Sequence, residues 1–480
     1  MSPSSHIRRH WAVFLGLAIG LTVWGAVDVA RRAIVDPQRP ALHMTDFTVY
    51  TEAGAAFFDG REPYDVANIR GWKYLYPPLF ALLVSPLAHL TPPWQALVWF
   101  GLSALMAFGS YFECRRLIAA CCEPGNGRNR DEELSGDRLA SVPTWLFVTA
   151  LVAPLFPALN CLQRGQMGLA LIYPLLLGFR LVWVERSPVR QALGGLVLAL
   201  PIALKLTPAL PVAACLAALG VAGWAQWRSW KTVSLATGGV VAGCLVFFLL
   251  LPASLLGWNA NLRHLQTWYV KVASRVDDVR SDDFGGDVAS LRNQSLHNAV
   301  FRCGNWIAHA LFDGPDDQKM NVRQGAMPMD APIVGRLLTT ARLAALAALT
   351  LVIVVAGRSR ELLLISAAFG LACVATLVVS PVSRGHYFVF WLPSVVFVPL
   401  WFLRIGDRQK ALVAAVIPAV LTAIHYVLLD YAGRAGLLGL GTTAWYFGSS
   451  WMIWRTRAAA SGIGVEPIPE SVSTVRARAA

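Results

Sequence analysis

Long apolar runs separated by short polar stretches dominate the chain. A helix that crosses a membrane needs about 20 predominantly apolar residues, and twelve runs approach that length. The pattern therefore predicts an all-α polytopic membrane protein with about twelve transmembrane helices. The runs cover residues 11–28, 94–113, 142–159, 166–183, 191–204, 207–226, 232–251, 335–356, 361–379, 386–403, 411–429 and 437–454. The first run is too long for a signal peptide and lacks a small-residue cleavage site, so we expect a retained helix.

Lysine and arginine concentrate in alternate short loops between these runs. The positive-inside rule assigns such loops to the cytoplasm. With twelve spans all of these loops fall on one side, and both termini are cytoplasmic. The basic residues concerned are Arg8, Arg9, Arg115, Arg116, Arg186, Arg190, Arg228, Lys231, Arg358, Arg360, Arg404, Arg408, Lys410, Arg455 and Arg457.

This arrangement predicts a single transmembrane domain over residues 1–458 of a multi-pass cell-membrane protein. A cytoplasmic loop is expected at about 114–141, and a disordered cytoplasmic tail at 459–480. The outer (periplasmic) face then holds two long segments, at about 29–75 and 252–333. Because both segments are rich in charged residues of both signs, we expect the chemistry on the outer side.

The apolar stretch 76–90 does not fit this count. It has only about 15 residues and is bounded by prolines at 77–78 and 92–93, which is short for a membrane-crossing helix. If it crossed, every later loop would change sides. We therefore interpret it as a re-entrant or interfacial segment, which is tolerated where protein or a cavity covers its backbone. A thirteenth span is the alternative.

Composition and charge support the membrane interpretation. Hydrophobic residues make up 56% of the chain and charged residues 14%, against about 25% charged in an ordinary globular protein. This excludes disordered, collagen-like and coiled-coil classes. The eight cysteines in 480 residues form no CxxC pair, which argues against a disulfide scaffold and against zinc or redox chemistry. The 41 Lys+Arg exceed the 28 Asp+Glu, giving a net charge of +13, and we expect membrane lipids but no nucleic acid as partners.

Within the first outer segment, residues 45–58 carry a helical start signal and end before Gly60. The spacing predicts an amphipathic helix lying at the membrane surface. Its apolar face comprises Val49, Ala53, Ala56 and Phe57. Asp46 would stand at the N-terminus, where the helix dipole favours the ionised carboxylate and lowers its pKa. Asp46 is then either only a helix cap or a catalytic group.

Three further polar corners lie at span boundaries on the same outer side. Charged residues at the edge of a membrane are costly, and by default they suggest function. Lys205 stands between two spans, although a lysine that only extends its amine to water is the alternative. The other two corners are Arg164-Gly165-Gln166 and Ser383-Arg384-Gly385-His386-Tyr387.

The second outer segment gathers hydrogen-bonding side chains over residues 293–302, a composition that suits sugar hydroxyls but is also common in loops. This group includes Asn293, Gln294, Ser295 and Arg302. The pairs Asp277/Asp278 and Asp282/Asp283 are either metal ligands or part of a solvated acidic loop, and we favour the loop. No Gly-rich phosphate loop, HExxH motif or nucleophile elbow occurs.

Taken in chain order, these corners resemble glycosyltransferase family 87, a family of integral-membrane enzymes in the GT-C superfamily. The resemblance covers about residues 40–390. It rests on Asp46-x3-Tyr50-x9-Gly60-x3-Tyr64, Tyr76-Pro77-Pro78-Leu79, Gly165-Gln166, Lys205-Leu206-Thr207-Pro208, Asn293-Gln294-Ser295-Leu296 with Arg302, and Ser380-Pro381-Val382-Ser383 with His386.

The resemblance implies a GT-C fold with an outer-face catalytic cavity. It also implies an inverting transfer of a hexose, mannose in the best-known members, from a polyprenyl-phosphate sugar to a lipid or glycan acceptor. Asp46 would be the general base. The lipid phosphate would be bound by Lys205, Arg302, Arg384, His386 and Arg164, and the sugar or acceptor by Tyr50, Tyr76, Gln166, Asn293, Gln294 and Ser295. Because cationic side chains would serve the phosphate, we expect no metal and no cofactor.

Two positions depart from the family pattern. The family often has Asn two residues after Gly-Gln, where this chain has Gly168. It also often has a Trp and a pair of His after Ser-Pro-x-Ser, where this chain has Arg384 and a single His386 followed by Tyr387. Both departures fall in expected active-site loops, so they bear on which donor or acceptor is used.

Two other classes of protein are compatible with a polytopic chain. A transporter or flippase for a lipid-linked sugar would show weak inverted-repeat symmetry between its halves, and we find no such repeat. A membrane O-acyltransferase would need a buried histidine with Asn or Asp in a span, and His425 is the only candidate.

Overall fold

Helices make up nearly all of the regular structure. The computed structural model describes residues 19–20, 22–39, 43–69, 71–122, 143–275, 291, 293–300, 302 and 332–460. Within these ranges β-structure is limited to two isolated bridges, Ala67–Lys73 and Asn293–Arg384. The predicted cytoplasmic loop and tail lie largely outside the described residues, as do Asp277, Asp278, Asp282 and Asp283. The all-α prediction is confirmed.

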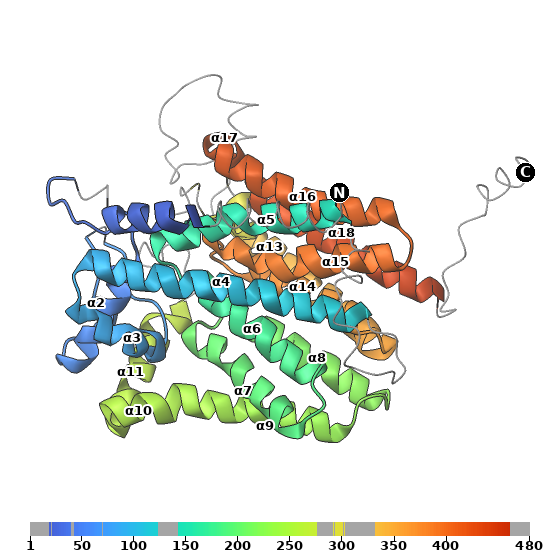
Figure 1. Ribbon diagram of the computed structural model, residues 1–480, viewed down its shortest axis with the longest axis horizontal. Coiled ribbons are helices and arrows are strands. Elements are labelled where there is room, and N and C mark those ends of the chain that lie inside the picture. The colour runs from blue at the N-terminus through green and yellow to red at the C-terminus, as the bar shows by residue number, and fades with distance from the viewer. Residues whose placement is uncertain are drawn as a thin grey trace, which may run out of the picture.

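Long helices form a bundle whose members lie side by side (Figure 1). They are α4 (Pro92–Cys122), α5 (Thr144–Arg164), α6 (Gly168–Trp183), α7 (Pro188–Leu204), α8 (Ala209–Trp224), α9 (Trp230–Cys244) continued by η5 (Leu245–Leu250) and α10 (Leu251–Leu256), α13 (Pro332–Ser359), α14 (Leu362–Val379), η9 (Gly385–Phe390) with α15 (Trp391–Arg404), α16 (Arg408–Val427) and α18 (Leu437–Ala460). Residues 22–32 are also helical. Eleven of the twelve predicted apolar runs therefore coincide with these bundle helices, and half of the first run lies outside the described residues.

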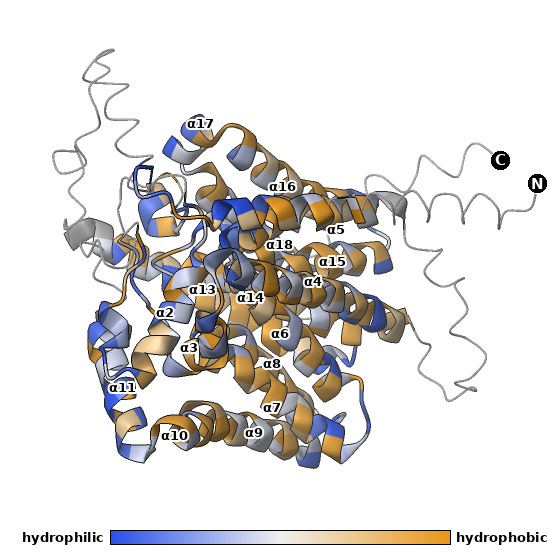
Figure 2. Cartoon of the chain, turned by 60° about the vertical axis from the view of Figure 1, so that its left-hand side comes forward, coloured by the Kyte–Doolittle hydropathy of each residue, from blue (hydrophilic) through white to orange (hydrophobic). Residues whose placement is uncertain are grey.

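Six helices of the described chain are long and apolar enough to cross a membrane, as expected of a polytopic membrane protein. Four further apolar helices are shorter. Figure 2 shows the same division, with hydrophobic colouring along the helices and hydrophilic residues gathered towards the ends of the bundle. The six long helices are Pro92–Cys122, Trp230–Leu256, Gly335–Arg358, Leu362–Val379, Gly385–Arg404 and Arg408–Val427.

Short helices cover one end of the bundle, which we call the capped end (Figure 1). They are α2 (Phe47–Phe58), η2 (Pro63–Asp65), α3 (Pro78–Val84), η3 (Ser85–His89), α11 (Trp258–Lys271) and η6 (Ala273–Arg275); α17 (Leu429–Arg434) joins α16 to α18. We call the opposite end, where helices α4, α6, α8, α13 and α15 end, the basic end.

The stretch 76–90 forms α3 and η3, which pack against α2. Twelve residues in these two conformations span at most about 20 Å, well below the roughly 30 Å of a bilayer core. The length agrees with the predicted re-entrant or interfacial segment.

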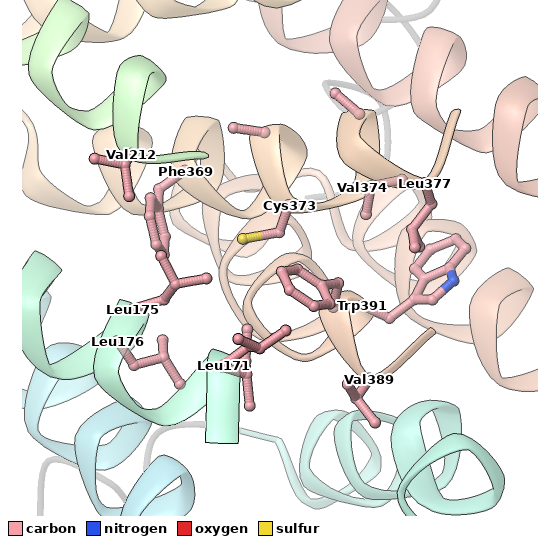
Figure 3. Packing of buried hydrophobic residues seen from close by; sticks show 14 of the residues in the cluster. Leu171, Leu175, Leu176, Val212, Phe369, Cys373, Val374, Leu377, Val389 and Trp391 are labelled. Atoms are coloured by element: carbon pink, nitrogen blue, oxygen red, sulfur yellow. The ribbon is translucent and has the colours of Figure 1, made fainter. Parts of the chain in front are cut away.

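Helix α14 lies at the centre of the bundle and is buried along almost its whole length. Figure 3 shows side chains from α6, α8 and α15 packed around it. Phe369 of α14 stacks on Phe179 of α6 with ring centroids 4.3 Å apart, and Trp391 at the start of α15 is fully buried. This core fixes the ends of α6, α14 and α15, which carry candidate site residues.

Helices α7 and α9 touch through their backbones. A Cβ at Gly195 would overlap the carbonyl oxygen of Ala236, and one at Gly243 would lie 2.6 Å from the Cβ of Ala199. Small residues permit this close approach, which is typical of membrane helix pairs. The contact holds α7 in place, and the residue that follows α7 is Lys205.

The prediction that residues 45–58 form an amphipathic helix at the membrane surface is wrong about the surroundings of the helix. Helix α2 forms, but it is buried on most sides, with Thr48, Tyr50 and Thr51 as buried as the expected apolar face. The physical reason is that α3, η3 and α4 pack around it. At Gly54 a Cβ would lie only 2.8 Å from the Cβ of Ser85. Helix α2 is thus an internal wall at the capped end.

Candidate active site

An open cavity of about 530 Å³ lies at the capped end, where the start of α2, the α5–α6 turn and the α14–η9 loop meet. We call it the carboxylate cavity, because Asp46 is the one acidic residue in its wall among the described residues. Its lining residues are Asp46, Val49, Tyr50, Trp72, Lys73, Leu75, Tyr76, Gln166, Arg384, His386 and Tyr387. Six residues predicted as site residues therefore face one cavity: Asp46, Tyr50, Tyr76, Gln166, Arg384 and His386.

Asp46 stands at the N-cap of α2, but its carboxylate makes no capping hydrogen bond. Thr45 Oγ1 instead accepts from the backbone N–H of Phe47 at 3.1 Å. The Asp46 carboxylate pairs with Arg164, with Nη2 3.0 Å from Oδ2, and accepts a hydrogen bond from Gln166 Nε2. The interpretation of Asp46 as only a helix cap is therefore wrong.

The turn between α5 and α6 places both partners of this carboxylate. Gly165 caps α5 with a left-handed φ of 67°, which glycine adopts at little cost. A Cβ there would lie 2.7 Å from the Cβ of Phe47. The Asp46 backbone N–H donates to the Arg164 carbonyl at 2.7 Å. The turn thus brings Arg164 and Gln166 to Asp46 from either side of one glycine.

Burial raises the pKa of the Asp46 carboxyl, and this outweighs the charges of Arg164 and Arg384 and the hydrogen bonds from Arg164 and Gln166, which act to lower it. The expectation that the helix dipole lowers this pKa is therefore wrong. The reason is that the side chain is only 5% exposed, and desolvation disfavours its charged form. A raised pKa makes the ionised carboxylate a stronger base than an exposed aspartate.

A second, narrower cavity adjoins the first. We call it the lysine cavity, because Lys205 lies in its wall. Gln166, His386 and Tyr387 line both cavities and so lie between them. Lys205 Nζ is 3.6 Å from the centre of the Tyr387 ring and 5.2 Å from that of Tyr76. Such cation–π contacts stabilise the charged amine. Because Tyr76 also lines the carboxylate cavity, the predicted site residue Lys205 lies next to that cavity.

The α14–η9 loop brings Arg384 and His386 to the same place. The Arg384 guanidinium lies 5.7 Å from the Trp72 ring centre, and Arg164 lies 4.5 Å from the same ring. His386 is 2% exposed, and its Nε2 has no hydrogen-bond partner within the described part of the chain. A buried ring nitrogen of this kind is available to a substrate oxygen.

Five predicted site residues do not line either cavity. One of them, Arg164, pairs with Asp46; the other four bind protein groups elsewhere. Asn293 Oδ1 accepts from the backbone N–H of Ser383 at 3.0 Å, and Arg302 Nε donates to the Gly433 carbonyl at 2.9 Å. Gln294 Nε2 donates to the Leu291 carbonyl at 2.7 Å. The remaining one, Ser295, shares a hydrogen bond with Asn298. These four side chains bind protein groups, and Asn293 holds the Arg384 loop through Ser383. Their contact with substrate stays a prediction.

Three polar or aromatic residues that line the carboxylate cavity were not predicted as site residues: Trp72, Lys73 and Tyr387. Tyr387 was noted at the end of the polar corner 383–387 and as a departure from the family pattern, but it was not assigned a role in the site. Trp72 and Lys73 precede Tyr76 in the first outer segment. A tryptophan in a polar stretch was the one sequence feature that could have marked them as site residues. Their role follows from tertiary contacts that no local pattern encodes.

Potential metal ligands do not cluster in the described residues. No group of three or more His, Cys, Asp or Glu side chains that could hold a metal ion occurs within those ranges. The described cysteines are all unpaired.

The sequence profile of glycosyltransferase family 87 matches residues 74–381, well over half of the chain. The chain belongs to glycosyltransferase family 87. It is therefore a glycosyltransferase, which acts on a sugar donor and an acceptor. Comparison with curated proteins and with solved structures gives no match.

The family match includes Tyr76, Arg164, Gln166 and Lys205 but ends before Arg384 and begins after Asp46. The structure joins the two outlying parts to the matched region, because Asp46 pairs with Arg164 and His386 lines both cavities together with Gln166. The cavity is thus built from the family region and from the segments on either side of it.

The departure at Gly168 has a structural explanation. A Cβ at this position would lie 2.8 Å from Cys161 Sγ and 3.0 Å from a methyl group of Val389. Cys161 Sγ contacts the His386 carbonyl at 3.3 Å as a hydrogen-bond donor. The space for a larger family residue is therefore filled by Cys161, which holds the His386 segment instead.

Proposed function

We propose that this glycosyltransferase moves a hexose, mannose in particular, from a polyprenyl-phosphate sugar to a lipid or glycan acceptor, with inversion at the anomeric carbon. The observation that carries the proposal is the carboxylate cavity itself. It presents one buried carboxylate, Asp46, in a wall whose other ionisable groups include Arg384, His386 and, in the adjoining cavity, Lys205. A base beside an anion-binding group is what transfer from a sugar phosphate requires.

In the proposed reaction Asp46 accepts the proton of the acceptor hydroxyl as its oxygen attacks the anomeric carbon. The bond between that carbon and the phosphate oxygen breaks, and its electron pair leaves with the lipid phosphate. Lys205 and Arg384 supply positive charge for this phosphate, and His386 Nε2 supplies a further hydrogen-bonding group. Arg164 is paired with Asp46 and holds the base in place.

We also propose a GT-C arrangement of about twelve spans with the cavity on the outer face. Helix α6 supports this orientation, because Gln166 precedes it at the capped end and Arg186 follows it at the basic end. The other basic loops likewise follow helices that run from the capped end. Since basic loops stay in the cytoplasm, the capped end would face outward.

The orientation is testable with single cysteines at exposed positions. Gln266 lies on α11 at the capped end, and Ser187 lies in the α6–α7 loop at the basic end. A membrane-impermeant maleimide added to intact cells should label Gln266→Cys and leave Ser187→Cys at the background of the wild-type protein. Labelling of Ser187→Cys without labelling of Gln266→Cys would show that the capped end faces the cytoplasm and would contradict the proposed orientation.

The donor is testable with purified protein in lipid nanodiscs. Radiolabelled hexose supplied on polyprenyl phosphate should enter a glycoside, whereas the same hexose on a nucleotide should not. In sealed vesicles a flippase would instead move the labelled lipid between leaflets without forming a glycosidic bond. Transfer from the nucleotide sugar alone would contradict the proposal.

A further inference from the structure

The partner of the Asp46 carboxylate is itself held by a tyrosine. The Tyr50 hydroxyl donates to Gln166 Oε1 at 3.3 Å, while Gln166 Nε2 donates to Asp46 Oδ2. Tyr50, Gln166 and Asp46 are all buried. Tyr50 therefore touches the base only through the amide of Gln166.

An amide has two different ends, and only its NH₂ can donate. With the Tyr50 hydroxyl bound to Oε1, the NH₂ points at Asp46. If the amide turned over, Oε1 would face the Asp46 carboxylate, two acceptors would meet, and the ionised form would lose a hydrogen bond. The tyrosine hydroxyl thus selects the amide orientation that favours an ionised Asp46.

The hydroxyl of Tyr50 is fixed in turn by neighbouring aromatic rings. The Tyr50 ring centre lies 5.5 Å from that of Tyr76 and 4.9 Å from that of Phe80. Tyr76 and Tyr387 in turn flank Lys205, whose Nζ lies 5.2 Å and 3.6 Å from their ring centres. Packed aromatic rings therefore hold the Tyr50 hydroxyl at Gln166. Burial raises the pKa of Tyr50 and of Tyr76 well above their usual value of 10.0, so both stay protonated.

We propose that Tyr50 is a positioning residue, which holds the Gln166 amide with its NH₂ against Asp46 and so keeps the carboxylate ionised and aimed into the cavity. This inference rests on the proposed role of Asp46 as the base. Under this inference Tyr50 does not bind the sugar or the acceptor directly, which is the role that the family resemblance implies.

The sign of the effect follows from the groups that face Asp46. The Gln166 hydrogen bond lowers the pKa of Asp46, so its loss raises that pKa further. The base then stays protonated up to a higher pH, and the acidic limb of the activity profile moves upward. Arg164 from α5 faces Asp46 directly. The other titratable groups of the carboxylate cavity are Lys73 and Tyr76 from the loop before α3, and Arg384, His386 and Tyr387 from the α14–η9 region. All of these are unchanged by Tyr50→Phe.

The test compares pH profiles of kcat/KM for the full chain in nanodiscs with polyprenyl-phosphate hexose as donor. Tyr50→Phe should move the acidic limb up by about one pH unit, since a hydrogen bond to a charged group is worth roughly that shift. Gln166→Leu should move it in the same direction, and the double variant should move it no further than Gln166→Leu alone. Tyr64→Phe is the matched control, because Tyr64 is a buried tyrosine of the same cluster whose hydroxyl has no hydrogen-bond partner in the described residues. Its profile should be that of the wild type.

Tyr50→Phe could instead raise KM, leave the acidic limb unmoved and add its effect on KM to that of Gln166→Leu. That result would mean that Tyr50 binds substrate directly and would overturn the inference. An unmoved limb with a uniformly lowered kcat would mean a purely structural role and would overturn it as well. If Tyr50→Phe does not reach the membrane, Gln166→Leu alone takes its place, with a shift in the same direction expected and no shift contradicting the inference. Asp46→Asn distinguishes failure of the proposed function from failure of this inference. If Asp46→Asn is active, Asp46 is not the base. If Asp46→Asn is inactive and the acidic limb of Tyr50→Phe is unmoved, only the positioning role of Tyr50 is refuted.

Discussion

Asp46→Asn is expected to leave the protein in the membrane at its normal level and to lower the rate of sugar transfer about 10²–10⁴-fold, the usual contribution of a general base. Asparagine has nearly the same shape, so Arg164 and Gln166 keep a partner at this position. It cannot accept the proton of the acceptor hydroxyl. The measurement is the initial rate of transfer from polyprenyl-phosphate hexose, with the amount of protein determined in the same membranes.

Two variants control this experiment. Asp65→Asn changes an exposed carboxylate in a surface ion pair with Lys271, and such pairs contribute little, so transfer should be unaffected. Asp46→Glu keeps a carboxylate but moves it by about one methylene, and activity should be partly retained, since misplacement of a reacting group by about 1 Å can cost about 10²-fold. A fully active Asp46→Asn enzyme would refute the assignment of the base.

Lys205→Met should lower transfer by about 10²–10³-fold, the loss expected when one group that stabilises a developing negative charge is removed. Methionine has a similar length and can pack between the Tyr76 and Tyr387 rings, so the fold is preserved. The effect should appear in kcat, and inhibition by free polyprenyl phosphate should weaken, because both depend on the phosphate charge.

Lys205→Arg retains a positive charge and should keep part of the activity. Lys271→Met removes a half-exposed lysine on α11 and should leave transfer unchanged. Unaltered kcat and unaltered inhibition by polyprenyl phosphate in Lys205→Met would show that this lysine only extends its amine to water, as the alternative from the sequence holds.

The helices were predictable because their cause is local. Apolar runs of near membrane length became helices α4 to α18 with boundaries shifted by a few residues. The positions of Gln166, Lys205 and His386 were predictable for the same reason, since polar residues at the ends of apolar helices must meet at one end of a bundle. Asp46 was found through its place at a helix start, although its pKa was predicted in the wrong direction.

What could not be predicted depends on contacts between distant segments. The burial of α2 results from packing by α3, η3 and α4, so a helix with a weakly marked apolar face became an internal wall. Asn293 and Arg302 look like ligand-binding residues in the sequence, yet they satisfy backbone groups of the protein. Trp72 enters the site because Arg164 and Arg384 lie over its ring, a contact that sequence spacing does not reveal.

The anomeric configuration of the product tests the central claim most directly. If Asp46 acts as a base on the acceptor hydroxyl, no covalent sugar–enzyme intermediate forms, and a single displacement inverts the anomeric carbon. NMR of the glycoside formed from polyprenyl-phosphate hexose labelled with ¹³C at the anomeric carbon should therefore show a configuration opposite to that of the donor. A product with the donor's configuration, or labelled lipid that moves between leaflets without entering any glycoside, would contradict the account.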